Sequence, residues 1–176
     1  MDIRFVEPEL RELDALRCEA LALPLYSDER PLRGALGLVD WRMCGLVSRL
    51  VVRGQLSGLP GETMLLPGRP KLSMDKLFVF GLGPEAELRE PDLEAVVAHM
   101  LDTVARAGVR TTALALPGRV HGSVDATSAM EAFVAAATPR DEHDEVVLLE
   151  FATAHKEMQR VLERQRRRAR ADLSPP

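Results

Sequence analysis

The chain has 176 residues and a mass of 19.4 kDa, and 46% of its residues are hydrophobic and 28% are charged. This length and composition fit one globular domain and exclude wholesale disorder, a collagen-like repeat and a coiled-coil rod. The formal net charge of −4 argues against nucleic acid as the main partner, because that binding depends on clustered Lys and Arg side chains that neutralise phosphates.

The first part of the chain begins with strand-like and turn-like segments. Residues 3–6 form a short strand candidate, and residues 8–16 are typical of a turn or one helical turn. Residues 20–23 are apolar without a break and precede Pro24, as in a strand that is covered on both faces. We therefore expect a buried strand that ends at this proline.

One helix and two strands follow. A helix is predicted from residue 32 to about residue 50, because its apolar positions return every three or four residues. Gly54 then supplies a cap. Short apolar runs at residues 63–66 and 76–80 predict strands.

The second half of the chain alternates helices and strands. The predicted elements are a helix from Pro91 to before Gly108, a strand at residues 111–116, a helix capped by Ser123 and stopped by Pro139, a strand at residues 146–151, and a helix from Thr153 to about Ala171. This alternation implies parallel strands with helices on both faces, that is, a three-layer α/β/α sandwich. We expect residues 1–152 to form its body, and residues 153–176 to add a helix with a basic end and a short tail to the same domain.

The charge is concentrated at the C-terminal end. Residues 156–172 contain seven basic and three acidic side chains, which leaves the remainder more acidic than the whole. The candidate contacts for nucleic acid or a partner are Arg164, Arg166, Arg167, Arg168 and Arg170. A second interpretation is a solvated helix end, where cations complement the negative end of the helix dipole.

Two loops are candidate ligand sites, because they follow strands whose carboxyl ends border a crevice in this class of fold. Gly81-Leu82-Gly83 would let the backbone approach a ligand closely, although a tight turn explains the glycines equally well. In the second loop, Gly118 precedes Arg119, a fork for phosphate or carboxylate, and His121 could titrate near neutral pH. A plain exposed loop is the alternative.

Other reactive side chains give weaker signals. Cys18 and Cys44 are expected to be buried free thiols, and His99 to face water. His143 lies in an acidic run that we interpret as a solvated turn, so no metal site and no cofactor are predicted. Trp41 is expected to take part in packing.

No apolar run is long enough to span a bilayer and no secretion signal is evident, so the predicted location is cytoplasmic, without a membrane.

Four segments resemble a known family in their order and spacing. They are Glu19–Pro24, Pro31–Leu36, Gly54–Glu62 and Phe78–Gly83. Together they resemble the N-terminal domain of the leucyl (cytosol) aminopeptidases. The resemblance implies a macro-domain-like fold with a mixed sheet, and it makes the last helix similar to the one that leads to the catalytic domain of the full enzymes.

The resemblance also bears on activity. In that family the two metal ions and the catalytic residues belong to the C-terminal domain, around an Asn-Thr-Asp-Ala-Glu-Gly-Arg type of motif that this sequence lacks. Peptidase activity is therefore not expected. ADP-ribose-binding macro domains have an Asn-rich segment after the second strand, and this sequence has Leu23-Pro24-Leu25 there. ADP-ribose hydrolysis is not expected either.

Three functions remain open. The first is a stand-alone, non-catalytic domain that binds a partner protein or a small ligand, as a companion or regulator of a separate aminopeptidase, with self-association also expected. Exposed apolar residues along the last helix would favour it. The second is a nucleotide or ADP-ribose module that uses the two loops, which requires a cleft joining them. The third is nucleic-acid binding through the basic helix.

Overall fold

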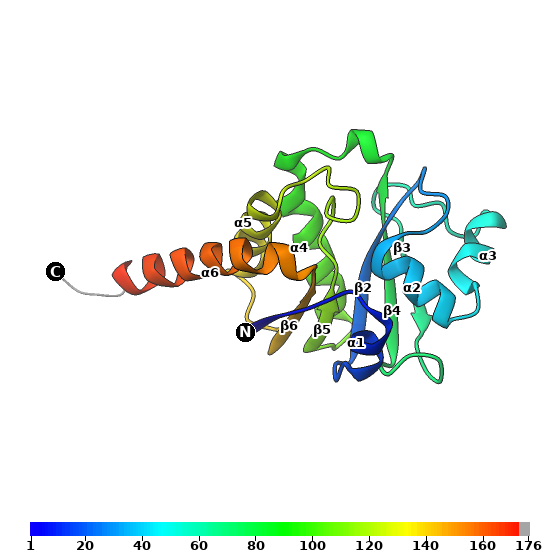
Figure 1. Cartoon of the computed structure of the whole chain (residues 1–176), viewed down its shortest axis with the longest axis horizontal. Coiled ribbons are helices and arrows are strands. Elements are labelled where there is room, and N and C mark those ends of the chain that lie inside the picture. The colour runs from blue at the N-terminus through cyan, green and yellow to red at the C-terminus, as the bar shows by residue number, and fades with distance from the viewer. Residues whose placement is uncertain (173–176) are drawn as a thin grey trace.

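The structure is a computed structural model that describes residues 1–172, with side chains up to residue 168. It confirms the predicted three-layer α/β/α sandwich with a mixed sheet of six strands (Figure 1). In sheet order the strands are β1 (Asp2–Val6), β6 (Glu145–Leu149), β5 (Thr111–Leu114), β2 (Ala20–Tyr26), β4 (Lys76–Gly83) and β3 (Thr63–Pro67). All neighbours pair in parallel except β3, which runs antiparallel to β4.

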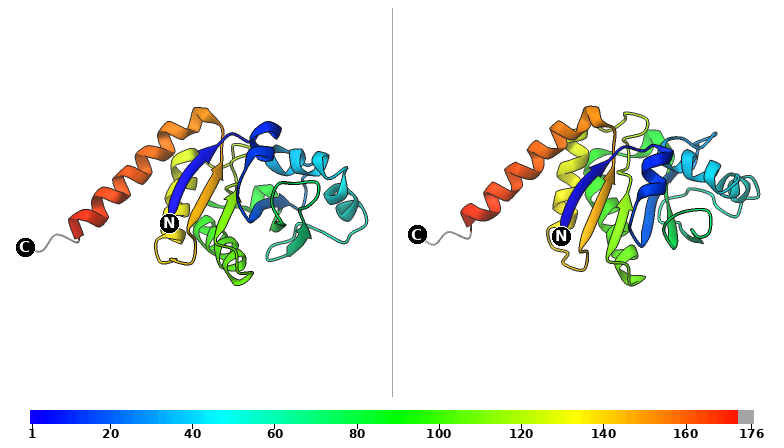
Figure 2. Two further views of the ribbon diagram at one scale, coloured as in Figure 1. Left: turned by 90° about the horizontal axis from the view of Figure 1, so that it is seen from below. Right: turned by 60° about the horizontal axis from the view of Figure 1, so that its bottom comes forward.

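Helices cover both faces of this sheet (Figure 2). One layer contains α1 (Leu10–Ala15), α2 (Gly34–Arg42) and α3 (Leu46–Val52), and the other contains α4 (Glu90–Arg106), α5 (Ala126–Ala137) and α6 (Ala152–Asp172). A short 3-10 helix, η1 (Glu85–Glu87), follows β4. All seven residues of β2 are buried. Its alternate side chains face opposite layers, which explains its continuous apolar sequence.

Strand β2 continues past Pro24, where the sequence predicted its end. The pairing of β2 with β5 ends at Ala22, whose carbonyl accepts a hydrogen bond from the N–H of Ala115 at 3.1 Å. Residues two apart in a strand point their backbone groups to the same edge. Pro24, which has no N–H, therefore faces the same side of β2 as Ala22, but β5 no longer pairs with β2 at this position. The proline therefore removes no hydrogen bond between the strands.

The single helix predicted for residues 32–50 was wrong, because the structure divides it into α2 and α3. Cys44 and Gly45 form the break, with left-handed φ angles of 56° and 74°. The apolar spacing continues across the break because both helices face the same core, so periodicity could not reveal it. The break also turns Cys44 to the surface, against the expected burial, whereas Cys18 is half-buried; both are free thiols.

The apolar side of α6 packs on the chain's own core. Ala154, Met158 and Val161 are buried there, so the described part of the helix has no exposed apolar side. Beyond Leu162 the helix extends away from the body of the domain (Figures 1 and 2). None of the helices in the described part of the chain is long and apolar enough to cross a membrane.

The cap of α5 is Asp125, not the predicted Ser123. The Asp125 carboxylate accepts hydrogen bonds from the N–H groups of Thr127 and Ser128 at 2.8 and 3.0 Å. The Ser123 hydroxyl instead donates to the carbonyl of Gly118. Ser123 and Asp125 are two positions apart, and both residue types cap helices. The path of the chain into α5 decides which of the two side chains reaches the free N–H groups.

Substitution Asp125→Ala should therefore lower the free energy of unfolding by about 1 kcal/mol, as measured by urea denaturation. Asp125→Asn keeps the acceptor oxygen and should cost only a small part of that. Ser123→Ala is the matched control and should cost less than Asp125→Ala. A larger loss in Ser123→Ala than in Asp125→Ala would contradict this assignment of the cap.

His143 is buried rather than part of a solvated turn. Its Nε2 lies 3.1 Å from the carbonyl oxygen of Leu101 in α4. Burial disfavours the charged imidazolium and lowers the pKa of His143 below its ordinary value of 6.5. The acidic neighbours of His143 made the segment look fully exposed, but this ring attaches it to α4.

Acidification should consequently destabilise the fold through His143. Below pH 6.5 the unfolded chain takes up a proton that the folded chain resists, so the free energy of unfolding falls by up to about 1.4 kcal/mol per pH unit from this group. His143→Gln removes that titration and should flatten the profile measured between neutral and mildly acidic pH. An unaltered slope in His143→Gln would refute this source of acid sensitivity.

Candidate functional site

The candidate site lies at the carboxyl ends of β2 and β5. After β2 the chain continues to α2 on one face of the sheet, and after β5 it continues to α5 on the other face. Neighbouring parallel strands whose connections diverge in this way leave a crevice, where ligands bind in open α/β sheets. Here the end of β2–β5 pairing at Ala22 opens that crevice.

The structure brings the two predicted loops to the same edge of the sheet. The first segment, Gly81–Gly83, was predicted as a loop but forms the end of strand β4, where Gly81 and Gly83 pair with Leu25 and Tyr26 of β2. The N–H of Ser27, directly after β2, donates to the carbonyl of Gly83 at 2.9 Å. The loop after β5 joins the same strand, since the N–H of Gly118 donates to the Tyr26 hydroxyl at 2.8 Å. The predicted neighbourhood of the two loops is therefore present.

The two glycines at the end of β4 lie close to the chain's own backbone. Gly81 and Gly83 donate their N–H groups to the carbonyls of Glu62 and Gly58, at 2.8 and 2.7 Å. A Cβ on Gly81 would lie 2.1 Å from the carbonyl oxygen of Leu59. The space beside these glycines, where a ligand was predicted to bind, is thus occupied by residues 58–62. Leu82, between the glycines, is buried.

The loop after β5 folds into the crevice. A Cβ on Gly118 would lie 2.2 Å from a methyl carbon of Val124, and one on Gly34 would lie 2.6 Å from Val120, so both glycines accommodate side chains of residues 120–124. Arg119 points inward: its Nε donates to a carboxylate oxygen of Glu150 and its Nη1 to the carbonyl of Val124, both at 2.6 Å. The Arg119 guanidinium, predicted as a candidate to bind an anionic ligand, is therefore paired with a carboxylate of this chain.

His121 lies between two carboxylates. Its Nδ1 is 3.1 Å from a carboxylate oxygen of Glu85, and its Nε2 is 3.6 Å from a carboxylate oxygen of Glu29. The same Glu29 oxygen accepts the N–H of Arg33 at 2.7 Å, just before α2 begins. A carboxylate of this chain thus occupies the position that favours an anion at the start of α2.

Burial governs the electrostatics of this cluster. The side chains of His121 and Glu29 are 8% and 5% exposed, and loss of solvent raises the pKa of Glu29 above its ordinary range. Burial likewise raises the pKa of the Tyr26 hydroxyl to about 12, so this group stays a neutral hydrogen-bonding partner. His121 Nε2 is buried without a hydrogen-bond partner among the described residues.

Little space is left in the crevice. The cavity beside Tyr26, Glu29 and His121 has a volume of about 10 Å³, which is room for about one water molecule. Among the described residues, no group of three His, Cys, Asp or Glu side chains is placed to hold a metal ion. In this conformation the crevice is closed by the chain's own loop.

Sequence reasoning missed the acidic partners of the two loops. Glu29 lies three residues after β2, Glu85 two residues after β4, and Glu150 directly after β6. Acidic residues just beyond the carboxyl ends of parallel strands were the available signal, because those ends meet at one edge. Their pairing with Arg119 and His121 could be recognised only in three dimensions.

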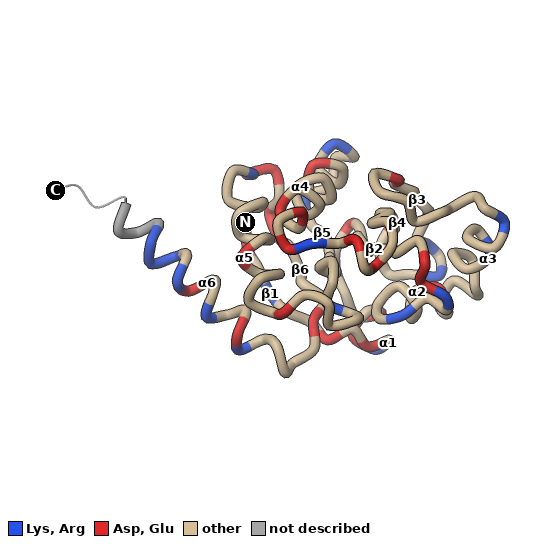
Figure 3. The backbone as a smooth tube through the Cα atoms, turned by 90° about the horizontal axis from the view of Figure 1, so that it is seen from above, with Lys and Arg blue, Asp and Glu red and all other residues tan. Residues whose placement is uncertain are grey.

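The arginine cluster lies far along the chain on α6 (Figure 3). Arg164, Arg166, Arg167 and Arg168 are exposed, and the Nη1 of Arg164 lies 3.3 Å from a carboxylate oxygen of Glu131 on α5. The side chain of Arg170 lies outside the described residues. The described arginines share one exposed helical segment, separate from the crevice.

The sequence matches the cytosol aminopeptidase family, N-terminal domain, over residues 22–145. A "Probable cytosol aminopeptidase" of Pseudomonas syringae pv. tomato is 27% identical over 114 residues, which are 65% of this chain and 22% of that protein. A protein of the same name from Actinobacillus pleuropneumoniae serotype 5b is 32% identical over 92 residues, which are 52% of this chain and 18% of that protein. The chain spans about a fifth of the length of the curated relatives it matches.

Solved structures share the fold at low sequence identity. A mutant leucine aminopeptidase of tomato superposes with a TM-score of 0.62 and 15% identity, over 92% of this chain and 35% of the enzyme. A Trypanosoma brucei macrodomain in complex with ADP superposes with a TM-score of 0.67 and 12% identity, over 91% of this chain and 67% of that one. These likenesses confirm the macro-domain-like fold.

The internal role of Arg119 can be tested by its removal. Arg119→Ala would leave Glu150 buried without its ionic partner, which should lower the free energy of unfolding in urea by about 3 to 5 kcal/mol. Exposed Arg89 provides the matched control, and Arg89→Ala should change stability by less than about 0.5 kcal/mol. A loss in Arg119→Ala no larger than that of the control would mean that Arg119 is available to a ligand.

Proposed function

This chain belongs to the cytosol aminopeptidase family through that family's N-terminal domain, and on this premise we propose that it is a non-catalytic module that binds a protein partner. The matched part of the family is the domain without the metal ions and catalytic residues, as the resemblance implies. The closed crevice supports the same choice, because no preformed space for a small substrate remains there. The surface that supports binding is the outer half of α6.

The observation that carries the proposal is the shape of α6. The apolar contacts of this helix end with Val161 and Leu162, yet the helix continues to Asp172. A helical segment that is polar all round is typical of an element that bridges to another domain or chain. Here it projects from the body, so a partner could contact it from several sides (Figure 2).

The charge of this segment supports a partner with an acidic surface. Four exposed arginines follow Leu162 in the described part of α6: Arg164, Arg166, Arg167 and Arg168. Arginine pairs well with carboxylates through its planar fork, so an acidic protein surface is the expected complement. We infer that this surface belongs to an aminopeptidase of the same family, because the curated relatives carry about four fifths of their length beyond the matched part. The names of these relatives support a cytoplasmic location for the encounter.

A binding experiment tests this proposal. The purified chain is mixed with a cytosol aminopeptidase from the organism that encodes it, and complex formation is measured by light scattering and calorimetry. A complex should form, and reversal of Arg166, Arg167 and Arg168 to Glu should weaken it about tenfold or more, because several ion pairs become repulsive contacts. The matched control reverses Arg11, Arg17 and Arg53, exposed arginines outside α6, and should leave the affinity within about twofold.

Other outcomes overturn the proposal. No complex, or a complex unaffected by the α6 reversals, contradicts this partner surface. Binding of duplex DNA with a steep loss of affinity in salt would support the nucleic-acid alternative instead. An increase in melting temperature with ADP-ribose would favour the nucleotide alternative, which requires residues 117–124 to leave the crevice, and for which the fold shared with an ADP-bound macrodomain is the supporting observation.

A further inference from the structure

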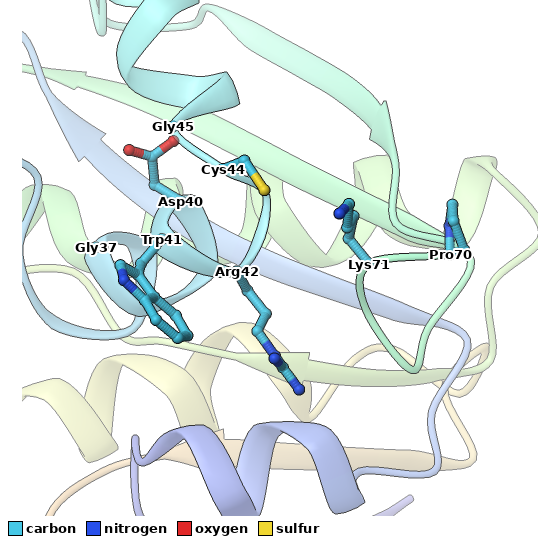
Figure 4. Close-up of a pocket in the computed structure, with 8 residues that line it drawn as sticks. All are labelled: Gly37, Asp40, Trp41, Arg42, Cys44, Gly45, Pro70 and Lys71. Atoms are coloured by element: carbon cyan, nitrogen blue, oxygen red, sulfur yellow. The ribbon is translucent and has the colours of Figure 1, made fainter.

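A second surface lies at the α2–α3 end of the molecule, remote from the outer half of α6 (Figure 1). An open groove of about 790 Å³ separates α2 and the turn after it from the loop that joins β3 to β4. Figure 4 shows Trp41 and Arg42 on the α2 side, with Lys71 and Pro70 on the facing loop. None of these residues contributes to the crevice.

Trp41 is the main apolar feature of the groove. It is the one tryptophan of the chain, and it is 66% exposed rather than packed as expected from the sequence. Its neighbours fill the core: Leu36 and Val39 on α2, and Met43 directly after the helix, are buried. The indole is therefore on the outer side of the helix, where it contributes nothing to that core. Exposed tryptophans flanked by polar groups are frequent anchors of protein interfaces.

The accessible charge around Trp41 is positive. Lys71 forms no ion pair among the described residues, and Arg42 pairs only with exposed Asp14. Arg49 does not line the groove, but its guanidinium donates to the carbonyl of Cys44, which does. An exposed pair such as Arg42–Asp14 contributes little to stability, so a partner's carboxylate could replace Asp14 at small cost.

The one carboxylate that lines the groove is not free to repel an anion strongly. Asp40 is buried, and it accepts hydrogen bonds from the N–H of Ser48 at 3.1 Å and from the Ser48 hydroxyl. Its charge is thus committed to the start of α3. The groove presents a net positive surface on a protein whose overall charge is negative.

We propose that this groove binds an extended acidic segment of a protein, with an apolar side chain against the Trp41 indole and carboxylates beside Lys71 and Arg42. Charge complementarity selects the acidic segment. The openness of the groove suits a chain that runs along it rather than an enclosed small molecule. A single-stranded nucleic acid is less suited, because such strands are bound by several successive aromatic rings and the groove holds one.

The binding test uses a random-peptide display selection on the purified full chain. Selected peptides should be rich in Asp and Glu and contain an apolar residue. The affinity of one such peptide is then measured by the fluorescence anisotropy of a label. Intrinsic emission offers a second readout: because Trp41 is the only tryptophan, its emission should shift to the blue when the peptide covers the indole.

Matched variants locate the binding. Trp41→Ala should weaken the peptide at least about tenfold, and Lys71→Glu about three- to tenfold, without loss of fold because both side chains are exposed. Arg53→Glu, an exposed cation outside the groove, should stay within about twofold. The triple reversal of Arg166, Arg167 and Arg168 should also leave the peptide affinity unchanged, which separates this site from the α6 surface.

Three results would overturn the inference. One is a selection that yields no acidic peptides. Another is an affinity that survives both Trp41→Ala and Lys71→Glu. The third is preferential binding of a single-stranded oligothymidylate with the same loss in Trp41→Ala, which would assign the groove to nucleic acid.

Discussion

The burial of β2 on both faces is the constraint from which the rest of the architecture follows. A strand with apolar side chains in both directions needs a helix layer on each side, and the chain supplies α2 and α3 on one face and α4 on the other. After β2 the chain passes through α2 and α3 to the edge strand β3, returns to β4 beside β2, and later forms β5 on the other side of β2, and the connections after β2 and β5 diverge. The crevice at the carboxyl ends is a geometric consequence of that order.

This crevice is filled by the protein itself. Val120 lies against Gly34, Arg119 reaches Glu150, and Glu29 accepts the N–H of Arg33 before α2. Each contact satisfies a group that could otherwise attract a ligand: an apolar hollow, a guanidinium and a helix start. Burying these groups without partners would be costly, so their mutual pairing stabilises the closed form. The fold is shared with macrodomains, and a shared fold does not by itself determine what fills the crevice.

Two exposed surfaces, at opposite ends of the molecule, are better placed to bind a partner than the filled crevice. The outer half of α6 makes no apolar contacts with the body and carries exposed arginines. At the α2–α3 end, the Trp41 indole is exposed near Arg42 and Lys71. Both are basic areas on an acidic protein. Long-range repulsion from the rest of the surface would disfavour acidic partners elsewhere, so positively charged areas are where such partners approach.

The sequence by itself determined the layers, the alternation of elements and the family resemblance, because these depend on local periodicity and on residue order. It also located two segments that border the crevice, although Gly81–Gly83 proved to be the end of strand β4 and not a loop. Only the tertiary structure decided what those segments do, because Arg119–Glu150 and His121–Glu85 join residues from separate parts of the chain. It also decided the left-handed break at Cys44 and the exposure of Trp41, because the spacing of apolar residues continues across a turn when both helices face one core.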